Sequence, residues 1–363
     1  MQGKIKNIIV VISFVAILSI GLLANIIAKD NEISTSERRK LAQFPKITVK
    51  KLLDGDVSED LEKYAVDQFV GRDFFRGIKS YVSKYAFGQL DNNGLFIKDG
   101  AIYKIEYPLN KEYVEKVADK INDVYKKYLE NMNVYYAIIP DKNYYLEDAH
   151  LKIDYKEIQN IIQNRIENIK YIDLLPELTI EDYYKTDTHW KQPNIRKVVS
   201  KIEKGMNLKD TSKVEYQEKE LGDFYGVYYS QIGMKVKPDT LKYLTNDTIE
   251  NCITYNYETK ETGKVYDLNK YNTSTDKYDI FLSGATPIIS IENPKANNNK
   301  ELLLFRDSFG SSIAPLLIEN YEKITLIDIR YISSDLLENY IEFNNQDVLF
   351  LYSGLVLNHN IFK

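Results

Sequence analysis

The sequence is poor in the residues that build disulfides and metal sites. It has one cysteine and three histidines among 363 residues. The lone thiol, Cys252, cannot form an intramolecular disulfide, and zinc sites built from several cysteines are excluded with it. The chain also lacks a basic excess, with 48 Lys+Arg against 53 Asp+Glu and a pI near 5.5. This balance argues against a nucleic-acid partner, and we expect no metal and no other cofactor.

One long apolar segment stands at the N-terminus. After Lys4 and Lys6, an uncharged and mainly apolar run extends from Asn7 to Ala28, close to the roughly 20 residues that span a bilayer as a helix. A cleaved signal peptide and a buried core helix are the alternatives. The length of the run favours an uncleaved single-pass anchor in the cell membrane, and the two lysines place the bulk of the chain outside the cytoplasm. We expect an anchor over 1–28, a juxtamembrane linker with a docking helix over 29–88, and one domain over 89–363.

The rest of the chain alternates between helical and strand patterns. Helical periodicity marks 58–88, 110–131, 156–169, 311–321 and 334–343, hairpin turn signals mark 88–100, and short apolar runs mark strands at 134–139, 170–174, 301–305, 324–329 and 348–352. Apolar strands separated by helices predict an α/β domain with a parallel sheet covered on both faces. Residues 208–300 are polar and interrupted by turns. We interpret them as an irregular insertion with some strands, which forms part of the wall of the substrate groove and is dispensable for folding.

Ser308 occupies a promising position for a nucleophile. It follows the strand ELLLF and precedes a predicted helix, so its hydroxyl lies at a strand-to-helix turn. Backbone N–H groups at such a turn can hold an oxyanion. The alternative is that Ser308 or Asp307 merely caps the helix.

A base for this serine is available in a second segment. Asp187 and His189 are separated by one residue, which in extended backbone places both side chains on one face, and the only tryptophan, Trp190, follows. A nucleophilic serine needs such a base, and the base needs a carboxylate to orient it. A surface aspartate with a histidine packed on Trp190 is the alternative. A metallophosphatase site would need further ligands, and His150 and His359 lie in unremarkable contexts.

These motifs together resemble a known family. Asp187-Thr188-His189-Trp190, followed much later by Arg306-Asp307-Ser308-Phe309-Gly310, is similar to the AlgX/AlgJ-like group of SGNH-hydrolase-like proteins and, more closely, to the bacterial DHHW family. The similarity begins near residue 37 and includes the segments Glu37 to Pro45, Gly94 to Ile97, Pro140 to Lys142, Tyr183 to Asp187, and Asp276 to Gly284.

The resemblance implies a flavodoxin-like, SGNH-hydrolase-like three-layer domain with a Ser308–His189–Asp187 triad. It also implies O-acetyl transfer to a cell-surface polysaccharide, usually beside a multispanning membrane protein that delivers acetyl groups. We expect Gly284, Arg306, Lys142 and Trp190 to bind the oxyanion or the substrate. Ala285 stands where the family pattern has an asparagine.

The sequence thus supports two hypotheses from different classes. The first is a membrane-anchored O-acetyltransferase or acetylesterase that acts through an acyl-serine intermediate. The second is a non-catalytic glycan-binding protein, or an envelope or spore assembly protein, that keeps the fold. The complete Ser/His/Asp set favours the first, because a binding module has no chemical need for all three residues.

Overall fold

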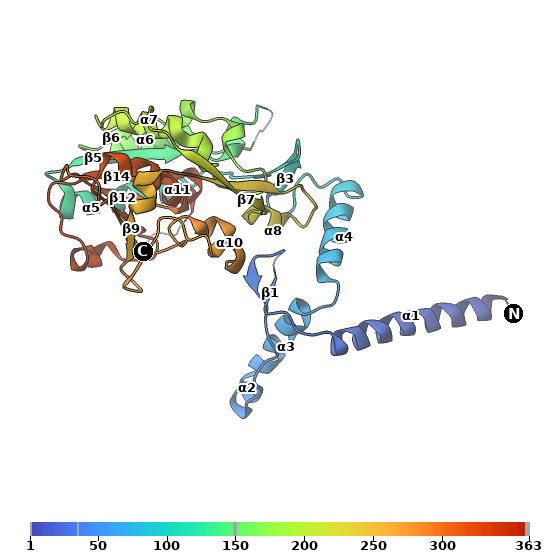
Figure 1. Ribbon diagram of the computed structural model, residues 1–363. Helices are drawn as coiled ribbons and strands as arrows, with labels where there is room; N and C mark the ends of the chain where they lie inside the picture. Colours follow the sequence, from blue (N-terminus) through green and yellow to red (C-terminus); the bar gives the residue numbers. More distant parts are fainter. Residues whose placement is uncertain (1, 35, 148–150, 360–363) are drawn as a thin grey trace. The chain divides into compact units, whose positions relative to one another are not determined.

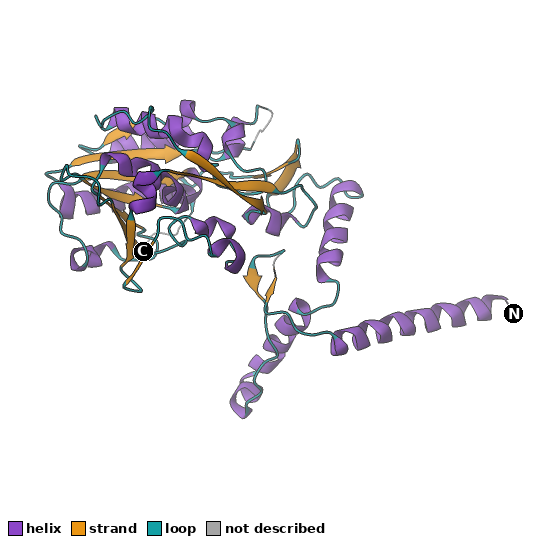
Figure 2. Cartoon of the chain, in the orientation of Figure 1, coloured by secondary structure: helices purple, strands orange, loops and turns teal. Residues whose placement is uncertain are grey.

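The computed structural model describes residues 2–34, 36–147 and 151–359, which form two compact units. The first, the N-terminal unit, contains residues 1–92 together with 229–235. The second, the sheet unit, contains residues 93–228 and 236–363. Figures 1 and 2 show their helices and strands.

The N-terminal unit begins with a long apolar helix, α1 (Gln2–Ile27). Its length and composition suffice to cross a membrane, and they are consistent with either an anchor or a signal sequence. The unit continues with β1 (Ile33–Ser34), β2 (Arg39–Lys40), α2 (Val49–Asp54), α3 (Asp56–Asp67) and α4 (Arg72–Tyr85). The single helix predicted over 58–88 is therefore two helices, because Gly71 takes a φ of +78° between them.

The Glu37–Arg39 segment holds this unit together by ion pairs. Arg39 binds both carboxylate oxygens of Asp67 at the end of α3, and Glu37 accepts from Arg72 and Arg76 on α4. The family-like motif after the apolar helix thus has a structural role, since it ties two helices to one extended segment.

The sheet unit is built on eight strands in the order β10-β9-β11-β13-β12-β14-β5-β6. The strands β13, β12, β14, β5 and β6 are parallel, and the other three are antiparallel. The strands are β5 (Asn133–Ile139), β6 (Lys170–Ile172), β9 (Ile253–Asn256), β10 (Glu261–Gly263), β11 (Ile288–Glu292), β12 (Glu301–Arg306), β13 (Lys323–Ile327) and β14 (Asp347–Ser353). The prediction of an α/β fold with a largely parallel sheet is confirmed.

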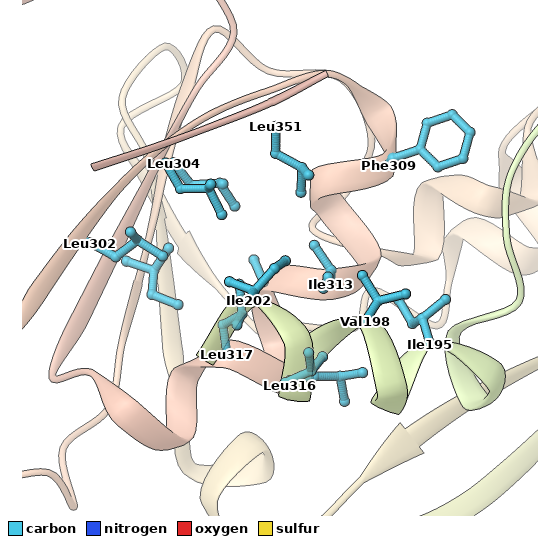
Figure 3. Packing of buried hydrophobic residues seen from close by; sticks show 14 of the residues in the cluster. Ile195, Val198, Ile202, Leu302, Leu304, Phe309, Ile313, Leu316, Leu317 and Leu351 are labelled. Carbon is cyan, nitrogen blue, oxygen red and sulfur yellow. The ribbon is translucent and has the colours of Figure 1, made fainter. Parts of the chain in front are cut away.

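Helices cover both faces of the sheet, because side chains of buried strands alternate between them. Leu302 and Leu304 of β12 face the cluster with α7 (Arg196–Gly205) and α11 (Ser308–Leu317), as Figure 3 shows. Leu303 and Phe305 face the other cluster, with α5 (Lys111–Val124), α6 (Tyr155–Arg165) and α12 (Gly354–Asn358). The helix predicted over 334–343 is a 3-10 helix at Ser334–Asn339.

Two hairpins and short helices complete the unit. They are β3 (Leu95–Lys98) with β4 (Ala101–Lys104), β7 (Gln217–Phe224) with β8 (Asp239–Thr245), α9 (Asp247–Asn251) and α10 (Lys270–Thr273). A further helix, α8 (Val227–Ile232), begins in this unit and continues into the segment that belongs to the N-terminal unit. Segment 208–300 differs from our prediction of an irregular, dispensable insertion. It supplies β9, β10 and β11 to the main sheet, and its Cys252 and Ile291 lie in the core. Burial raises the pKa of the Cys252 thiol to about 12.

Candidate active site

Ser308 is the first residue of α11, directly after strand β12. The preceding Asp307 caps the helix by accepting the Phe309 N–H at 3.0 Å, and its other oxygen accepts the Ser353 N–H at 2.7 Å. Asp307 thus ties the helix start to the end of β14. Because the first amides of a helix lack intrahelical partners, the N–H of Ser308 stays available to a ligand. We call residues 306–310 the turn half of the site.

Gly310 is required in the turn half by close packing. A Cβ at this position would lie 2.5 Å from Cβ of Arg306, far inside contact distance. The stem of Arg306 therefore crosses beneath the first turn of α11, and a residue without a side chain lets it pass. The close approach of Arg306 to Gly310 thus explains why a glycine follows Arg306 four positions later.

Residues 183–190, which we call the loop half, form a bent loop rather than the extended segment that we expected. The loop is closed by a bridge between Tyr183 and Trp190 and by the Tyr184 N–H, which donates to the His189 carbonyl at 3.1 Å. The bend brings Oδ1 of Asp187 to 2.9 Å from the His189 amide and 2.5 Å from its Nδ1. One carboxylate oxygen thus fixes both the backbone and the ring of His189.

The two halves meet at a hydrogen bond. Nε2 of His189 lies 2.7 Å from Oγ of Ser308, so serine, imidazole and carboxylate form one continuous chain. The second carboxylate oxygen of Asp187 accepts the Val227 N–H at 2.6 Å. His189 and Asp187 are buried, while Ser308 is partly exposed. This geometry orients Nδ1–H toward the carboxylate and leaves Nε2 free to accept the serine proton.

An aromatic ring holds the imidazole from one side. Tyr278 stacks on His189 with a centroid distance of 3.9 Å and an interplanar angle of 8°. Its hydroxyl lies 2.7 Å from Oγ of Ser312, which also accepts from Nε1 of Trp190 at 2.8 Å. Burial is the first cause that raises the pKa of the Tyr278 hydroxyl, so the ring stays neutral against the histidine.

Two buried charges hold the backbone of the loop half. Nζ of Lys142 donates to the carbonyls of Tyr184, Lys185 and Asp187 at 2.8, 3.1 and 2.8 Å. Burial lowers the pKa of this ammonium to about 8, and the carboxylate of Asp187 opposes that shift. From the other side, Asp239 on β8 accepts the N–H groups of Lys185 and Thr186, both at 2.8 Å.

Sequence reasoning missed the part played by Asp239, because no local pattern connects it with residues 53 and 54 positions away. The same holds for Gly226, where a Cβ would lie 2.1 Å from Cβ of Asp187. The only signal for Lys142 was its place in the Pro140–Lys142 segment, directly after a buried strand.

The four residues expected to bind oxyanion or substrate are engaged within the protein. The ammonium of Lys142 faces backbone carbonyls, Trp190 is fully buried, and Arg306 is fully buried with Nη1 3.7 Å from Asp328. The Gly284 N–H donates to the Phe281 carbonyl at 3.2 Å. Nε and Nη2 of Arg306 are buried without a hydrogen-bond partner among the described residues. Binding of the oxyanion or the substrate by these four residues stays a prediction.

The remaining histidines lie outside this arrangement. His359 pairs with Glu106 at 2.9 Å, and His150 is outside the described residues. Within the described ranges, no group of three histidine, cysteine, aspartate or glutamate side chains could hold a metal ion.

The chain is similar to several solved structures. A DHHW family protein from Eubacterium siraeum DSM 15702 is 21% identical with a TM-score of 0.58, over 74% of this chain and 94% of that one. Bacillus cereus PatB1, solved with a sulfonyl adduct, is 20% identical with a TM-score of 0.59, over 74% and 97%. The O-acetyltransferase domain of Pseudomonas putida AlgJ is 11% identical with a TM-score of 0.42, over 74% and 93%.

At these identities the similarity concerns the fold, and no curated protein matches the chain. The sequence itself matches the family described as DHHW protein over residues 164–327. This range includes the Asp187–His189 motif, Asp239 and Ser308. The resemblance to the DHHW family that the motifs predicted is therefore confirmed over these residues.

Proposed function

We propose that this protein is an acyl-transfer enzyme, an O-acetyltransferase or acetylesterase that acts on a cell-surface polysaccharide. The observation that carries the proposal is the continuous chain Ser308–His189–Asp187, with 2.7 Å and 2.5 Å between successive side chains. Such a chain is the arrangement that makes a serine hydroxyl nucleophilic. The motif resemblance supports acetyl as the acyl group and an exported glycan as the acceptor.

In the first half-reaction, Oγ of Ser308 attacks the carbonyl carbon of the acetyl donor. His189 takes the serine proton on Nε2, and the carboxylate of Asp187 stabilises the imidazolium. The C–O bond to the leaving group then breaks, and the leaving oxygen receives the proton from His189. The products are acetyl-Ser308 and the deacylated donor.

In the second half-reaction, a sugar hydroxyl or water attacks the acetyl-serine ester. His189 accepts the proton of the attacking hydroxyl, whose oxygen bonds to the acetyl carbon. The bond from that carbon to Oγ of Ser308 then breaks, and His189 returns the proton to Oγ. In both steps, the Ser308 N–H at the start of α11 is the oxyanion donor that we propose. The Gly284 N–H is held by Phe281, so we do not assign it to the oxyanion.

We further propose a flavodoxin-like, SGNH-type domain presented outside the cytoplasm by α1 as an uncleaved single-pass anchor. The apolar length of α1 and the leading Lys4 and Lys6 support this orientation. A multispanning membrane protein that supplies acetyl groups is the partner that the family resemblance suggests.

The test is acyl transfer by the full-length protein in detergent. With an activated acetyl ester, the wild-type protein should release the leaving group in a burst and carry acetyl on Ser308, detected by mass spectrometry. Ser308→Ala should lower the rate by about 10³-fold or more, since removing a triad nucleophile has effects of this order. A sulfonyl fluoride should label the wild-type protein at Ser308, in keeping with the adduct on the related fold of PatB1.

Ser311→Ala is the matched control, because Ser311 lies on the same helix and is buried. It should keep the wild-type burst. If folded wild-type protein releases no more than Ser308→Ala and takes no sulfonyl label, the enzyme proposal is wrong and the binding or assembly hypothesis takes its place.

A further inference from the structure

A pocket lined by tyrosines lies in the sheet unit, outside the Ser308 site. It has a volume of about 420 Å³, and we call it the tyrosine pocket. Its walls include Tyr257, Glu258, Ile288, Tyr331, Leu336 and Tyr340. This size is within the range of small-molecule sites in proteins.

The pocket gathers apolar side chains that the protein leaves in contact with solvent. Tyr331, Leu336 and Tyr340 are 48%, 48% and 46% exposed. Single exposed apolar residues are common, but a concave cluster of them marks a binding surface. The hydroxyls of Tyr331 and Tyr340 have no hydrogen-bond partner among the described residues, so each ring offers both an apolar face and a free polar group.

The rings are held in place by their neighbours. Arg330 makes two bonds to the carboxylate of Asp328, at 2.8 and 2.6 Å, and its guanidinium lies 5.4 Å from the centroid of the Tyr331 ring. Tyr257 meets Tyr340 edge to face at 6.5 Å. A ring that is already ordered loses less conformational entropy when a ligand binds.

The tyrosine pocket lies at the same end of the sheet as Ser308. Ile327 of β13 pairs with Phe305 in parallel register and with Ile288 in antiparallel register. Ile288 is therefore two strand spacings, roughly 10 Å, from the last residues of β12, which lead into Ser308. Asp328 also links the regions, because it binds Arg330 and faces the guanidinium of Arg306.

We propose that the tyrosine pocket binds a sugar unit of the saccharide whose hydroxyl reacts at Ser308, an assignment that rests on the proposed function. One face of a β-linked pyranose carries C–H groups that pack on an aromatic ring, and its hydroxyls need polar partners at the edge. The rings of Tyr331 and Tyr340 provide the aromatic surface for the C–H groups. Glu258, Lys260 and the tyrosine hydroxyls provide the polar partners for the sugar hydroxyls. Both charge signs at the rim suit a neutral saccharide better than a polyanion.

The test measures binding separately from chemistry. Full-length Ser308→Ala protein is titrated by calorimetry with β-1,4-linked oligomers of N-acetylglucosamine and of glucose. At least one series should bind, and Tyr331→Ala and Tyr340→Ala should each weaken binding about three- to tenfold, as expected for loss of an aromatic contact. Tyr331→Phe should bind within about twofold, because it keeps the ring.

Tyr107→Ala is the matched control, since Tyr107 is 58% exposed and outside the pocket. In the Ser308→Ala background it should bind saccharide as tightly as Ser308→Ala protein alone. Thermal melts verify that each variant is folded. Wild-type affinity in the pocket variants, or no binding by either series, overturns the proposal. A peptide ligand that competes at the pocket while saccharides do not would reassign it to a protein partner.

The failure of this inference is distinguishable from failure of the proposed function. In a Ser308 wild-type background, Tyr331→Ala should lower transfer to the saccharide more than it lowers acetyl release from the small activated ester, while Tyr107→Ala should leave both unchanged. Pocket-dependent saccharide binding without ester cleavage would retain the pocket and reject the enzyme. Ester cleavage with pocket-independent binding would retain the enzyme and reject the pocket.

Discussion

The two halves of the candidate site are held by different kinds of structure. The turn half continues a buried parallel strand into a helix, and its backbone is fixed by sheet register and by the cap from Asp307. The loop half has only a short bridge, and its shape depends on Lys142 and Asp239. Regular structure thus positions Ser308, the proposed nucleophile, whereas buried charges position His189 and Asp187, the proposed base and its carboxylate. The base should therefore be the easier partner to displace without unfolding the protein.

Adding a methyl group to each half gives the sharpest test of this difference. Gly226→Ala would place a Cβ 2.1 Å from Cβ of Asp187, so the carboxylate must leave His189. We expect the rate of acetyl release to fall about 10³–10⁴-fold, comparable to loss of a triad carboxylate, with a native far-ultraviolet circular dichroism spectrum. Gly310→Ala would press on Arg306 inside the core, and we expect a large loss of thermal stability as well.

Gly263→Ala is the control for both substitutions, since Gly263 is exposed at β10. It should keep activity and stability near wild type. Equal losses of stability in Gly226→Ala and Gly310→Ala would contradict the view that the loop half can shift independently.

Removing the buried ammonium should have the next largest effect. Lys142→Met keeps the approximate length of the side chain but leaves three buried carbonyls without their donor. We expect the rate to fall about 10- to 100-fold and the free energy of unfolding to fall by about 2–4 kcal/mol. Steady-state kinetics and urea unfolding measure the two losses.

Lys185→Met is the paired control, because Lys185 belongs to the same loop and its side chain is exposed. It should match wild type in both measurements. A Lys142→Met protein with normal turnover would show that the bridge and Asp239 suffice to shape the loop.

The smallest expected effect is a pH-dependent gain of stability when Asp141 is replaced by asparagine. Burial raises the pKa of this carboxyl to about 7 in the folded protein, against 3.8 ordinarily. Between these values the folded state keeps a proton that the unfolded state has lost, so stability falls as pH rises through this window. Asp141→Asn removes this titration, and its advantage should appear from about pH 4 and be complete above about pH 7.

We expect a gain of about 1–2 kcal/mol in the free energy of unfolding at pH 8, measured by urea titration across this range. Asp123→Asn, at an exposed position of α5, is the control and should change little at any pH. A loss of stability on Asp141→Asn at pH 8 would mean that the charged carboxylate supports its surroundings.

The turn half, which is held by regular structure, could be predicted from the sequence. The shape of the loop half, which is held by buried charges, could not. Strands such as 301–305 and 348–352 are continuous apolar runs, so their pattern predicted both the elements and the turn at Ser308. The Asp187–His189 pair was predicted as a motif, but its bent shape was not. That shape depends on Asp239 and Gly226, whose approach to the loop is tertiary and leaves no trace in local periodicity.

Composition alone gave a wrong prediction for segment 208–300. Its polar, turn-rich sequence predicted an insertion beside the fold, yet it carries three strands of the main sheet and the carboxylate that holds the loop half. A strand at the antiparallel side of a sheet can be short and polar and still be indispensable. The prediction that this segment can be replaced by a linker without loss of folding is therefore withdrawn.

The buried position of Cys252 has a practical consequence for chemistry at Ser308. A thiol that is enclosed by the core and whose pKa is raised to about 12 reacts slowly with electrophiles. In Ser308→Cys protein, the introduced thiol would thus be the sole accessible thiol, placed beside the imidazole of His189. An alkylating reagent would then count the accessible thiols at position 308 alone. A thioester formed at that position would identify the acyl donor that reaches the site.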